Sequence, residues 1–238
     1  MNPTIKVMVN GLPGNVSQIV AAQILKDERF ELVPFSLTGP EIQQSEFHLE
    51  PLKIDLIQPE KRKTQIEEVI KSHDGFLSVD FTHPTAVNAN AEFYCACGLP
   101  FVMGTTGGDR NKLEHTVTSS SIPAVIAPNM AKQIVGFQAM MAYAADTFPG
   151  LFKGYSLEIR ESHQRGKADT SGTAKAMVGY FNELGVSYSE DQILKVRDPG
   201  VQTEQWDIPE EYLAGHGWHT YTLVSPDRPD TQIGRAHV

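Results

Sequence analysis

Four basic or titratable side chains lie within eight residues in the middle of the chain. Arg160, His163, Arg165 and Lys167 belong to the stretch YSLEIRESHQRGKADTSGTAKAM, residues 155–177. An imidazole that titrates near neutral pH, beside a lysine that carries a point charge, can provide acid catalysis and hold an anion. The stretch therefore predicts an acid-assisted site with His163 and Lys167 as its catalytic residues. The alternative is a solvated basic loop.

The elements on either side of these residues would hold them in place. Apolar and polar residues alternate over 155–159, which is typical of a half-buried strand, and a helix is expected to begin after Ser171. The first N–H groups of that helix, at Gly172 and Thr173, lack intrahelical partners and carry the positive end of its dipole. The helix start therefore adds a second anion-binding element, and Gly172 lets a ligand approach closely.

The N-terminal segment has the pattern of a dinucleotide-binding turn. An apolar strand over 5–9 is followed by NGLPGNVS and then by apolar residues at helical spacing over 19–25. Glycines in such a turn allow close backbone approach to a pyrophosphate at the helix N-terminus. Gly11 and Gly14 occupy the first two glycine positions. The third is Ser17, which predicts looser helix packing rather than loss of the site.

Strand and helix patterns alternate after this turn, as in a parallel sheet covered by helices. Strands are expected over 31–36, 52–57, 75–81, 100–103 and 124–127, and helices over 64–71, 84–97, 109–119 and 130–146. From residue 150 the pattern changes to α+β, with strands over 193–196 and 219–224 and a turn-rich loop that contains DPG (198–200). The predicted fold class is α/β: a Rossmann-like dinucleotide-binding domain followed by an α+β domain.

Three polar loops follow strands of the first domain. They are DFT at 80–82, GTTGG at 104–108 and APNM at 127–130. Ligands of such sheets bind at the carboxyl ends of the strands, so the three loops are expected to share one site. Ordinary turns would explain any one of them, but they explain all three together less well.

The second strand bears on the choice of cofactor. A fold that uses NAD usually places an acid there for the ribose 2′-hydroxyl, but this strand runs into Ser36 and Thr38. The absence of a carboxylate favours NADPH, with NADH as the alternative because Glu41 is nearby. No arginine for a 2′-phosphate is evident.

Composition excludes several classes of protein. The formal net charge of −9 disfavours a nucleic-acid partner, and no run approaches the roughly 18 apolar residues of a membrane span. From its first residues the chain is expected to pass directly into a strand, without a signal or transit peptide. Cys95 and Cys97 are expected on a helix, and no His/Cys spacing suits zinc, so no metal site is predicted. A reducing, cytosol-like compartment is expected.

These motifs together resemble 4-hydroxy-tetrahydrodipicolinate reductase (dihydrodipicolinate reductase), in the plant-like branch of that family. The matching segments follow in order through nearly the whole chain: VNGLPGNV, SVDFTHPTAV, PFVMGTTGGDRNKL, APNMAKQ, ESHQRGKADTSGTAKA and GHGWHTYTLVSPD. The resemblance implies reduction of 4-hydroxy-tetrahydrodipicolinate to tetrahydrodipicolinate by NAD(P)H with loss of water, in lysine (diaminopimelate) biosynthesis. It also implies a homotetramer and a small dicarboxylate substrate, whose charge accounts for the basic cluster.

The resemblance assigns roles to particular residues. His163 and Lys167 stand at the proton-donor positions, and Gly172 and Thr173 at the positions that bind a substrate carboxylate. The pyrophosphate would be held by Gly11, Leu12, Pro13, Gly14, Asn15 and Val16. The nicotinamide would be lined by Gly104, Thr105, Thr106, Ala127, Pro128, Asn129 and Met130. Gln164 replaces a histidine that other members have, and His83 replaces an arginine, so the roles of both stay open.

The end of the chain departs from the family. In the family a longer segment completes the second sheet, whereas residues 233–238 (IGRAHV) resemble the translation of a sequencing adapter. We therefore expect a dinucleotide-binding domain over 1–130, an incomplete substrate-binding and oligomerisation domain over 131–232, and a non-native tail over 233–238. Such a fragment would be impaired as an enzyme. Its expected compartment is the cytoplasm, with the plastid stroma as the alternative if a transit peptide is missing.

Two other functions compete with this one. A semialdehyde-type dehydrogenase would share the first domain but needs a nucleophilic cysteine at an exposed turn, where neither cysteine is expected. A non-catalytic dinucleotide-binding module, or an inactive fragment, would not need His163 and Lys167.

Overall fold

The chain folds into two compact units, Met1–Pro128 and Asn129–Val238. The computed structural model describes residues 3–127, 129–167, 170–227 and 232–233. No helix among these residues is both long and apolar enough to cross a membrane.

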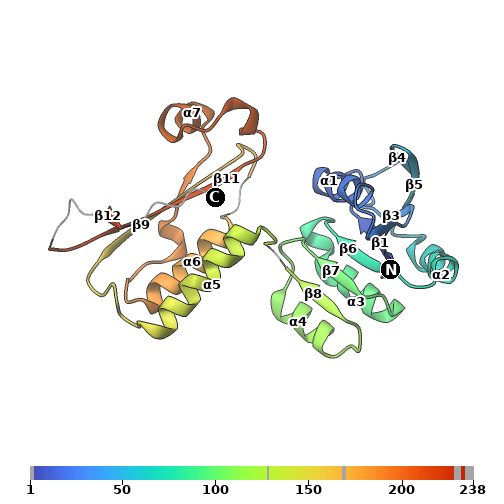
Figure 1. The fold of residues 1–238 in the computed structure, drawn as a ribbon, viewed down its shortest axis with the longest axis horizontal. Coiled ribbons are helices and arrows are strands. Elements are labelled where there is room, and N and C mark those ends of the chain that lie inside the picture. The colour runs from blue at the N-terminus through green and yellow to red at the C-terminus, as the bar shows by residue number, and fades with distance from the viewer. Residues whose placement is uncertain (1–2, 128, 168–169, 228–231, 234–238) are drawn as a thin grey trace. The chain divides into compact units, whose positions relative to one another are not determined.

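The first unit is built on a parallel five-stranded sheet (Figure 1). Its strands are β1 (Ile5–Asn10), β2 (Phe30–Leu32), β6 (Leu77–Asp80), β7 (Phe101–Met103) and β8 (Ala124–Ile126). Their order is β2-β1-β6-β7-β8, so the chain reverses direction across the sheet beside β1. The carboxyl ends of β1 and β6 lie together, because Asn10 pairs with Asp80. This is the edge at which a parallel sheet of this kind binds ligands.

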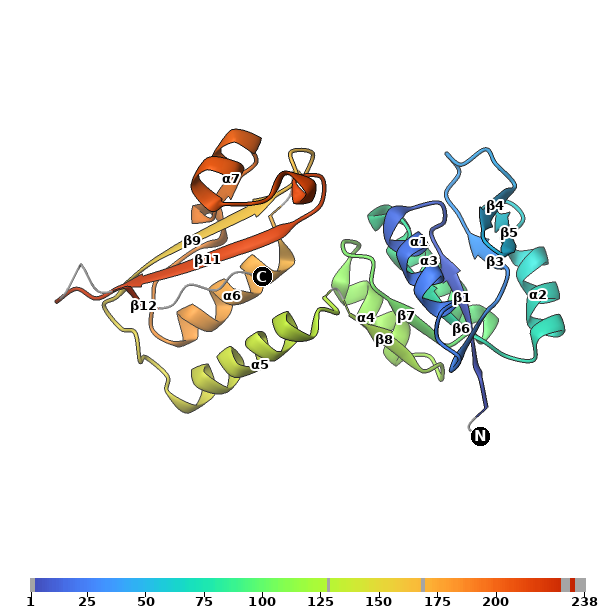
Figure 2. The same ribbon diagram turned by 45° about the horizontal axis from the view of Figure 1, so that its top comes forward.

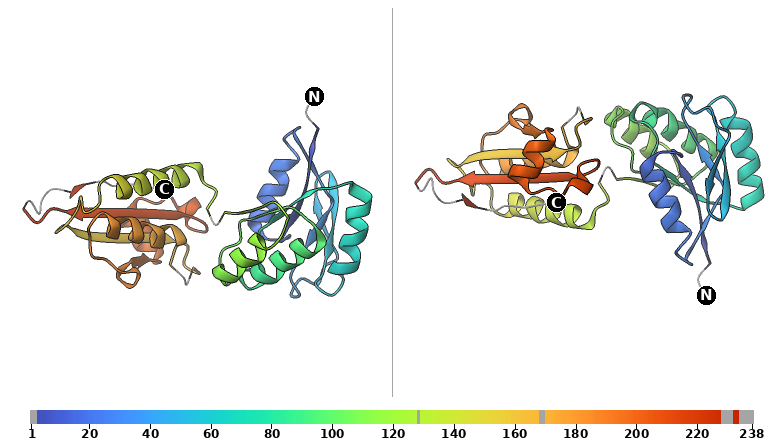
Figure 3. Two further views of the ribbon diagram at one scale, coloured as in Figure 1. Left: turned by 90° about the horizontal axis from the view of Figure 1, so that it is seen from below. Right: turned by 90° about the horizontal axis from the view of Figure 1, so that it is seen from above.

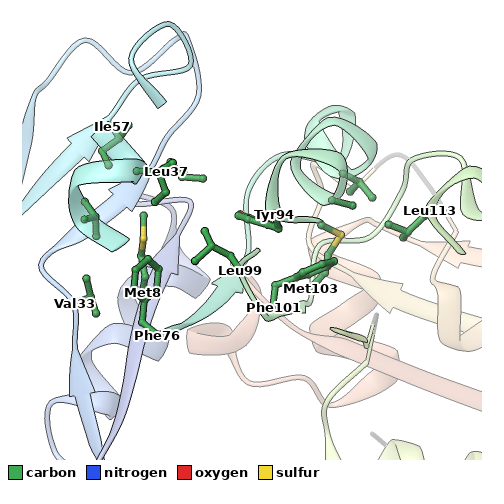
Figure 4. Packing of buried hydrophobic residues seen from close by; sticks show 14 residues of the cluster. Met8, Val33, Leu37, Ile57, Phe76, Tyr94, Leu99, Phe101, Met103 and Leu113 are labelled. Carbon is green, nitrogen blue, oxygen red and sulfur yellow. The ribbon is translucent and has the colours of Figure 1, made fainter. Parts of the chain in front are cut away.

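Helices cover both faces of this sheet. They are α1 (Asn15–Ile24), α2 (Arg62–His73), α3 (Val87–Cys97), preceded by the 3₁₀ turn η1 (Pro84–Ala86), and α4 (Arg110–Thr118). Alternation along β1 sends Val7 and Val9 into a core with Ala21 of α1, and Met8 into the opposite core. That second core contains Val33, Tyr94, Phe101 and other buried side chains (Figure 4).

A second, three-stranded sheet interrupts the alternation. It consists of β3 (Phe35–Leu37), β4 (Glu46–Leu49) and β5 (Leu52–Ile57), in the order β3-β5-β4. The single strand expected over 31–36 is therefore wrong: β2 and β3 are separate strands in different sheets. Pro34 stands between them, and proline has no N–H to donate to a ladder.

The second unit has a four-stranded sheet of order β10-β9-β11-β12. Its strands are β9 (Ser156–His163), β10 (Leu194–Val196), β11 (Gly217–Val224) and the two-residue β12 (Gln232–Ile233). Helices α5 (Lys132–Thr147) and α6 (Gly172–Glu183) lie on one face and α7 (Pro199–Trp206) on the other (Figure 2). Strands β9 and β11 run antiparallel along the length of the unit (Figure 3), and their partners include His163 with Gly217 and Glu161 with His219.

One expectation for this unit is wrong. The loop expected at DPG contains the start of α7, because Asp198 accepts a hydrogen bond from the Val201 N–H (3.0 Å) and Pro199 occupies the first turn. Of the methionines in α5, Met141 packs against the core of this unit and Met140 is exposed.

Candidate active site

An ion pair with a fully buried carboxylate fixes the end of strand β9. Glu161 has no exposed side-chain surface, and its Oε1 lies 2.6 Å from Arg197 Nη2. Its Oε2 accepts a hydrogen bond from the Ser171 N–H (2.8 Å). The one carboxylate therefore joins β9, the residue after β10 and the N-cap of α6. A buried charge is tolerated only when it is paired and hydrogen-bonded in this way.

His163 follows Glu161 on the same face of β9. Its side chain is 12% exposed, and Nδ1 lies 3.9 Å from Glu161 Oε2. Burial lowers the pKa of His163 to about 4; the Glu161 carboxylate opposes this, whereas His219, Arg197 and Lys167 add to it. The expectation that His163 titrates near neutral pH is therefore wrong for the free protein. Its imidazole is neutral there because burial penalises the charged form.

Lys167 lies in the turn that leads from β9 to α6. Its N–H donates to the carbonyl of Gln164 (3.0 Å), and its carbonyl accepts from Arg197 Nε (2.8 Å). Arg197 therefore holds Glu161 and the backbone of Lys167 at the same time. Lys167 is half-buried and close enough to His163 to lower the pKa of that imidazole. The structure thus brings the two predicted catalytic residues together.

The predicted substrate-binding residues form the start of α6. The Ser171 hydroxyl accepts from the Thr173 N–H (3.2 Å), which makes Ser171 the N-cap, as expected. A Cβ added at Gly172 would meet nothing within 4 Å, so the backbone there is open to approach. Thr173 Oγ1 accepts from Asn129 Nδ2 (2.9 Å). Asn129, assigned to the nicotinamide by resemblance, therefore contacts a residue assigned to the substrate.

These groups line a cavity of about 550 Å³ inside the second unit. His163, Ser171, Thr173 and Asn129 contribute to its wall. The rest comes from α5 and from a segment that did not enter the predicted site; these residues are Ala131, Ile134, Tyr212, Gly215, His216, Gly217, Trp218 and His219. A sequence signal for this part of the wall exists in the motif GHGWHTYTL, which matches the family but carries no assigned role in the sequence analysis.

The two histidines of that segment differ in their bonding. His216 Nε2 lies 2.8 Å from Ser162 Oγ and its Nδ1 lies 3.1 Å from the Tyr212 carbonyl, so both ring nitrogens are engaged. His219 is buried, with Nδ1 3.2 Å from the Tyr221 hydroxyl. Burial lowers the pKa of both His216 and His219.

The glycine turn of the first unit lines a larger cavity, of about 790 Å³. Gly11 has φ +104°, and a Cβ there would run into the carbonyl oxygen of Phe81. A Cβ on Gly14 would lie 2.8 Å from the carbonyl oxygen of Gly11. Gly14 is the N-cap of α1, so Asn15 and Val16 open that helix. A backbone without Cβ atoms at a helix N-terminus fits a pyrophosphate.

Ser17 packs closely rather than loosely. It is fully buried, and its Oγ donates to the carbonyl of Asn10 (3.0 Å). The hydroxyl therefore ties α1 to the end of β1, where glycine would leave a plain contact. The expectation of looser packing is wrong.

Ser36 and Thr38 hold the turn, and Thr38 also lines the larger cavity. The Leu12 N–H donates to Ser36 Oγ (3.2 Å), and Thr38 Oγ1 donates to the Leu12 carbonyl (2.8 Å). Both side chains are buried. The cavity wall does include Glu41 and, contrary to expectation, an arginine: Arg62 at the start of α2.

Asp80 is a buried hub beneath this cavity that the sequence did not single out. It accepts hydrogen bonds from Tyr94 Oη (2.6 Å), Thr105 Oγ1 (2.8 Å), Thr82 Oγ1 (2.7 Å) and Asn90 Nδ2 (3.0 Å). Burial, and then the Asp80 charge, raise the pKa of Tyr94 well above its ordinary value, so its hydroxyl stays a donor. The hub links the loops that follow β6 and β7.

The remaining predicted cofactor residues have varied surroundings. The Thr105 hydroxyl is committed to Asp80, Gly104 lies against the ring of Phe81, and Thr106 is exposed. The Ala127 N–H donates to the Met103 carbonyl (2.9 Å), and Met130 is exposed. Pro128 lies outside the described residues. His83 lies on the wall of the larger cavity, where its Nδ1 accepts from the Thr85 N–H (3.3 Å) and caps η1.

The fold and these two cavities define a class: a Rossmann-like α/β domain joined to an α+β domain whose cavity is lined by His163 and the start of α6. The family described as "Dihydrodipicolinate reductase, N-terminus" matches residues 5–130. The chain is 46% identical over 223 residues to "4-hydroxy-tetrahydrodipicolinate reductase 1, chloroplastic" of Arabidopsis thaliana, covering 94% of this chain and 64% of the relative. It is 44% identical to "Probable 4-hydroxy-tetrahydrodipicolinate reductase 2, chloroplastic" of Oryza sativa subsp. japonica, covering 93% and 68%.

A solved structure agrees on the fold. The chain aligns with "Dipicolinate bound Dihydrodipicolinate reductase from Paenisporosarcina sp. TG-14" at a TM-score of 0.64 and 18% identity, covering 98% of this chain and 88% of that one. The chain therefore belongs to the dihydrodipicolinate reductase family. It spans about two thirds of the length of the curated plant relatives.

Proposed function

We propose that the chain reduces 4-hydroxy-tetrahydrodipicolinate to tetrahydrodipicolinate with a nicotinamide dinucleotide. The observation that carries this is the Glu161–Arg197 pair, which ties strand β9, the turn at Lys167 and the start of α6 together beside a cavity lined by His163, Ser171 and Thr173. The site is built for a small anion, in a chain 46% identical to a protein of that name.

The first unit has the features that a dinucleotide requires. Gly11 and Gly14 leave the backbone of the turn bare, and the first turn of α1 offers N–H groups beside the larger cavity. Gly11, Leu12, Pro13 and Gly14 line that cavity and would hold the pyrophosphate. The bound dinucleotide supplies hydride chemistry.

The second unit would hold the substrate and supply a proton. The N–H groups at Gly172 and Thr173 would bind one carboxylate, and the Lys167 ammonium would attract the dianion. A bound dianion favours the protonated form of His163, which burial suppresses in the free protein. Substrate binding itself would therefore charge His163. After water has left the ring, either His163 or Lys167 would deliver the proton to the ring carbon next to the one that accepts the hydride.

The test is substrate-dependent oxidation of NAD(P)H by the purified chain. Turnover with 4-hydroxy-tetrahydrodipicolinate that is lost in His163→Gln supports the proposal. The outcome for a non-catalytic module is different. The wild type would never turn over, and the His163→Gln, Lys167→Ala double variant would bind dinucleotide with the same affinity as the wild type.

We propose that NADPH is accepted at least as well as NADH. Ser36 and Thr38 are engaged with Leu12, so the support for NADPH comes from Arg62 on the cavity wall. Its guanidinium stacks over Phe93 (4.6 Å to the ring centroid) and Nη1 donates to Asn90 Oδ1 (3.3 Å), which would orient it at the cavity wall. Glu41 lies on the same wall and accounts for use of NADH.

Cofactor titrations test this assignment without turnover. Arg62→Met should weaken NADPH binding at least about tenfold more than NADH binding, because a guanidinium–phosphate contact is charge-assisted. Arg62→Lys is the charge-retaining control, and Glu41→Gln should affect NADH more. Equal losses for both dinucleotides in Arg62→Met would contradict the role.

We propose further that the protein acts in the plastid as a homotetramer. The proposal of a plastid location is supported by the plant relatives, whose names describe them as chloroplastic, and it replaces the expectation of a cytoplasmic location. The proposal of a tetramer is supported by the family resemblance. Fractionation of plant tissue and sedimentation of the purified protein test the two statements separately.

A further inference from the structure

We propose that Glu161, His163 and His219 form a site for a borderline-soft divalent cation such as Zn²⁺, and that occupancy inhibits the enzyme. The inhibition rests on the proposed function, but metal binding does not. One carboxylate oxygen and one nitrogen from each histidine lie within 4.8 Å of one another. No spacing in the sequence indicated this site, because His219 is far from the other two residues and is brought in by the β9–β11 pairing.

Two buried nitrogens point to a ligand. Within the described part of the chain, His163 Nδ1 and His219 Nε2 are buried without a hydrogen-bond partner. His219 is 3% exposed, so its nitrogen does not reach solvent. A buried polar atom left unpaired is destabilising, and a metal ion bound to both nitrogens would remove that cost for each.

The surroundings have the arrangement of an outer ligand shell. Tyr221 Oη lies 3.2 Å from His219 Nδ1, and Arg197 and the Ser171 N–H orient the Glu161 carboxylate. Partners of this kind fix the tautomer and orientation of metal ligands. Both imidazoles have lowered pKa values and are neutral near pH 7, the form that binds metal.

The three ligands must close on the ion. Zinc bonds of about 2.0–2.2 Å place tetrahedral ligands roughly 3.4 Å apart. The His163 Nδ1–Glu161 Oε2 distance of 3.9 Å must shorten by about half an ångström, and a separation at the 4.8 Å limit of the cluster by about 1.4 Å, through side-chain rotation of the histidines. His163 and His219 both line the 550 Å³ cavity, which gives the ion an entry path and leaves room for water as a fourth ligand.

Inhibition follows from the role of His163. A metal ion on Nδ1 prevents that nitrogen from accepting a proton and fixes the ring. Arg197 offsets the charge of Glu161, so the site offers two neutral imidazoles and little net negative charge, which disfavours hard cations that rely on charge alone. Mg²⁺, which prefers oxygen ligands, should therefore neither bind nor inhibit.

The experiment is Zn²⁺ titration against a chelating dye, with one tight site expected per chain. His219→Gln and His163→Gln should each lower the Zn²⁺ affinity at least tenfold. His216→Gln is the matched control for metal binding, since His216 lines the same cavity with both nitrogens engaged, and it should leave the affinity unchanged. Zinc binding that is equal in wild type and His219→Gln, or absent in wild type, overturns the proposal.

Two further measurements keep the test decisive. If His219→Gln does not fold, X-ray absorption of the wild-type zinc adduct decides, because it must show two imidazole ligands, and an adduct without them overturns the site. Zn²⁺ should also inhibit turnover in competition with substrate. A chain that binds Zn²⁺ as described but never turns over refutes the proposed function and leaves the metal site standing.

Discussion

Replacement of Glu161 by glutamine should destabilise the second unit selectively. Glutamine keeps the shape and can still accept from the Ser171 N–H, but it removes the charge that faces Arg197 at 2.6 Å. Loss of one partner of a buried pair costs about 3–5 kcal/mol. Arg197 keeps bonds to the carbonyls of Val196 (3.0 Å) and Lys167 (2.8 Å) and is 17% exposed, so we expect a smaller cost, about 2–3 kcal/mol.

Tryptophan fluorescence in urea is the appropriate assay. Both tryptophans of the chain, Trp206 and Trp218, lie in the second unit, so the signal reports its unfolding alone. With a urea m-value of about 1.5 kcal/mol/M, the midpoint should fall by roughly 1.3–2 M.

A control on the same strand sharpens this test. Glu158→Gln removes an exposed carboxylate whose oxygen lies 3.7 Å from Arg160 Nε, and exposed pairs contribute about 0–1 kcal/mol. Its midpoint should barely move. If Glu161→Gln shifts the midpoint no more than Glu158→Gln does, the buried pair does not organise the site and the reasoning is refuted.

Three other outcomes are expected. Burial holds the folded-state pKa of His163 at about 4, below its unfolded value of about 6.5. The unfolding free energy of the second unit should therefore decline as pH falls from about 6.5 to 4, and His163→Gln should flatten this decline. An unchanged slope in His163→Gln would contradict this expectation. Gly11→Ala should abolish dinucleotide binding, measured by calorimetry. The control is Gly75→Ala, which is also at positive φ (+85°) but has nothing within 4 Å of an added Cβ. It should lower the unfolding free energy by only about 1–2 kcal/mol and leave dinucleotide binding intact. Asp80→Asn turns one acceptor of the hub into a donor, so it should lower stability by about 2–4 kcal/mol, measured by circular dichroism, and dinucleotide affinity at least about tenfold, measured by fluorescence titration. Asp55→Asn, at an exposed position, should change neither quantity. Equal behaviour of the two variants would refute the role of the hub.

The elements that the sequence predicted are those with strong local signals. The glycine turn, the alternating strand that ends at His163 and the Ser171 cap are each set by neighbouring residues. Helix α7 was missed because DPG was interpreted as a turn, although an Asp N-cap followed by proline also begins helices. The strand over 31–36 was misjudged because Pro34 interrupts it.

The missing parts of the site depend on contacts between distant segments. Glu161 stands two residues before His163, the spacing that puts both on one face of a strand, so a signal for it existed. The role of Glu161 depends on its contacts with Arg197 and Ser171, and only the fold brings those residues to the carboxylate. Arg62 and His219 likewise reach their cavities from elements far along the chain. The lowered pKa of His163 depends on burial, which sequence spacing does not predict.

The central claim is that Lys167 and His163 act on a dicarboxylate substrate in the second unit. The most direct test is kcat/KM for 4-hydroxy-tetrahydrodipicolinate in Lys167→Ala, with dinucleotide affinity measured alongside. We predict a fall of more than about tenfold, which corresponds to at least roughly 1.4 kcal/mol of transition-state stabilisation, with dinucleotide affinity unchanged. Near-normal kcat/KM in Lys167→Ala would contradict the account.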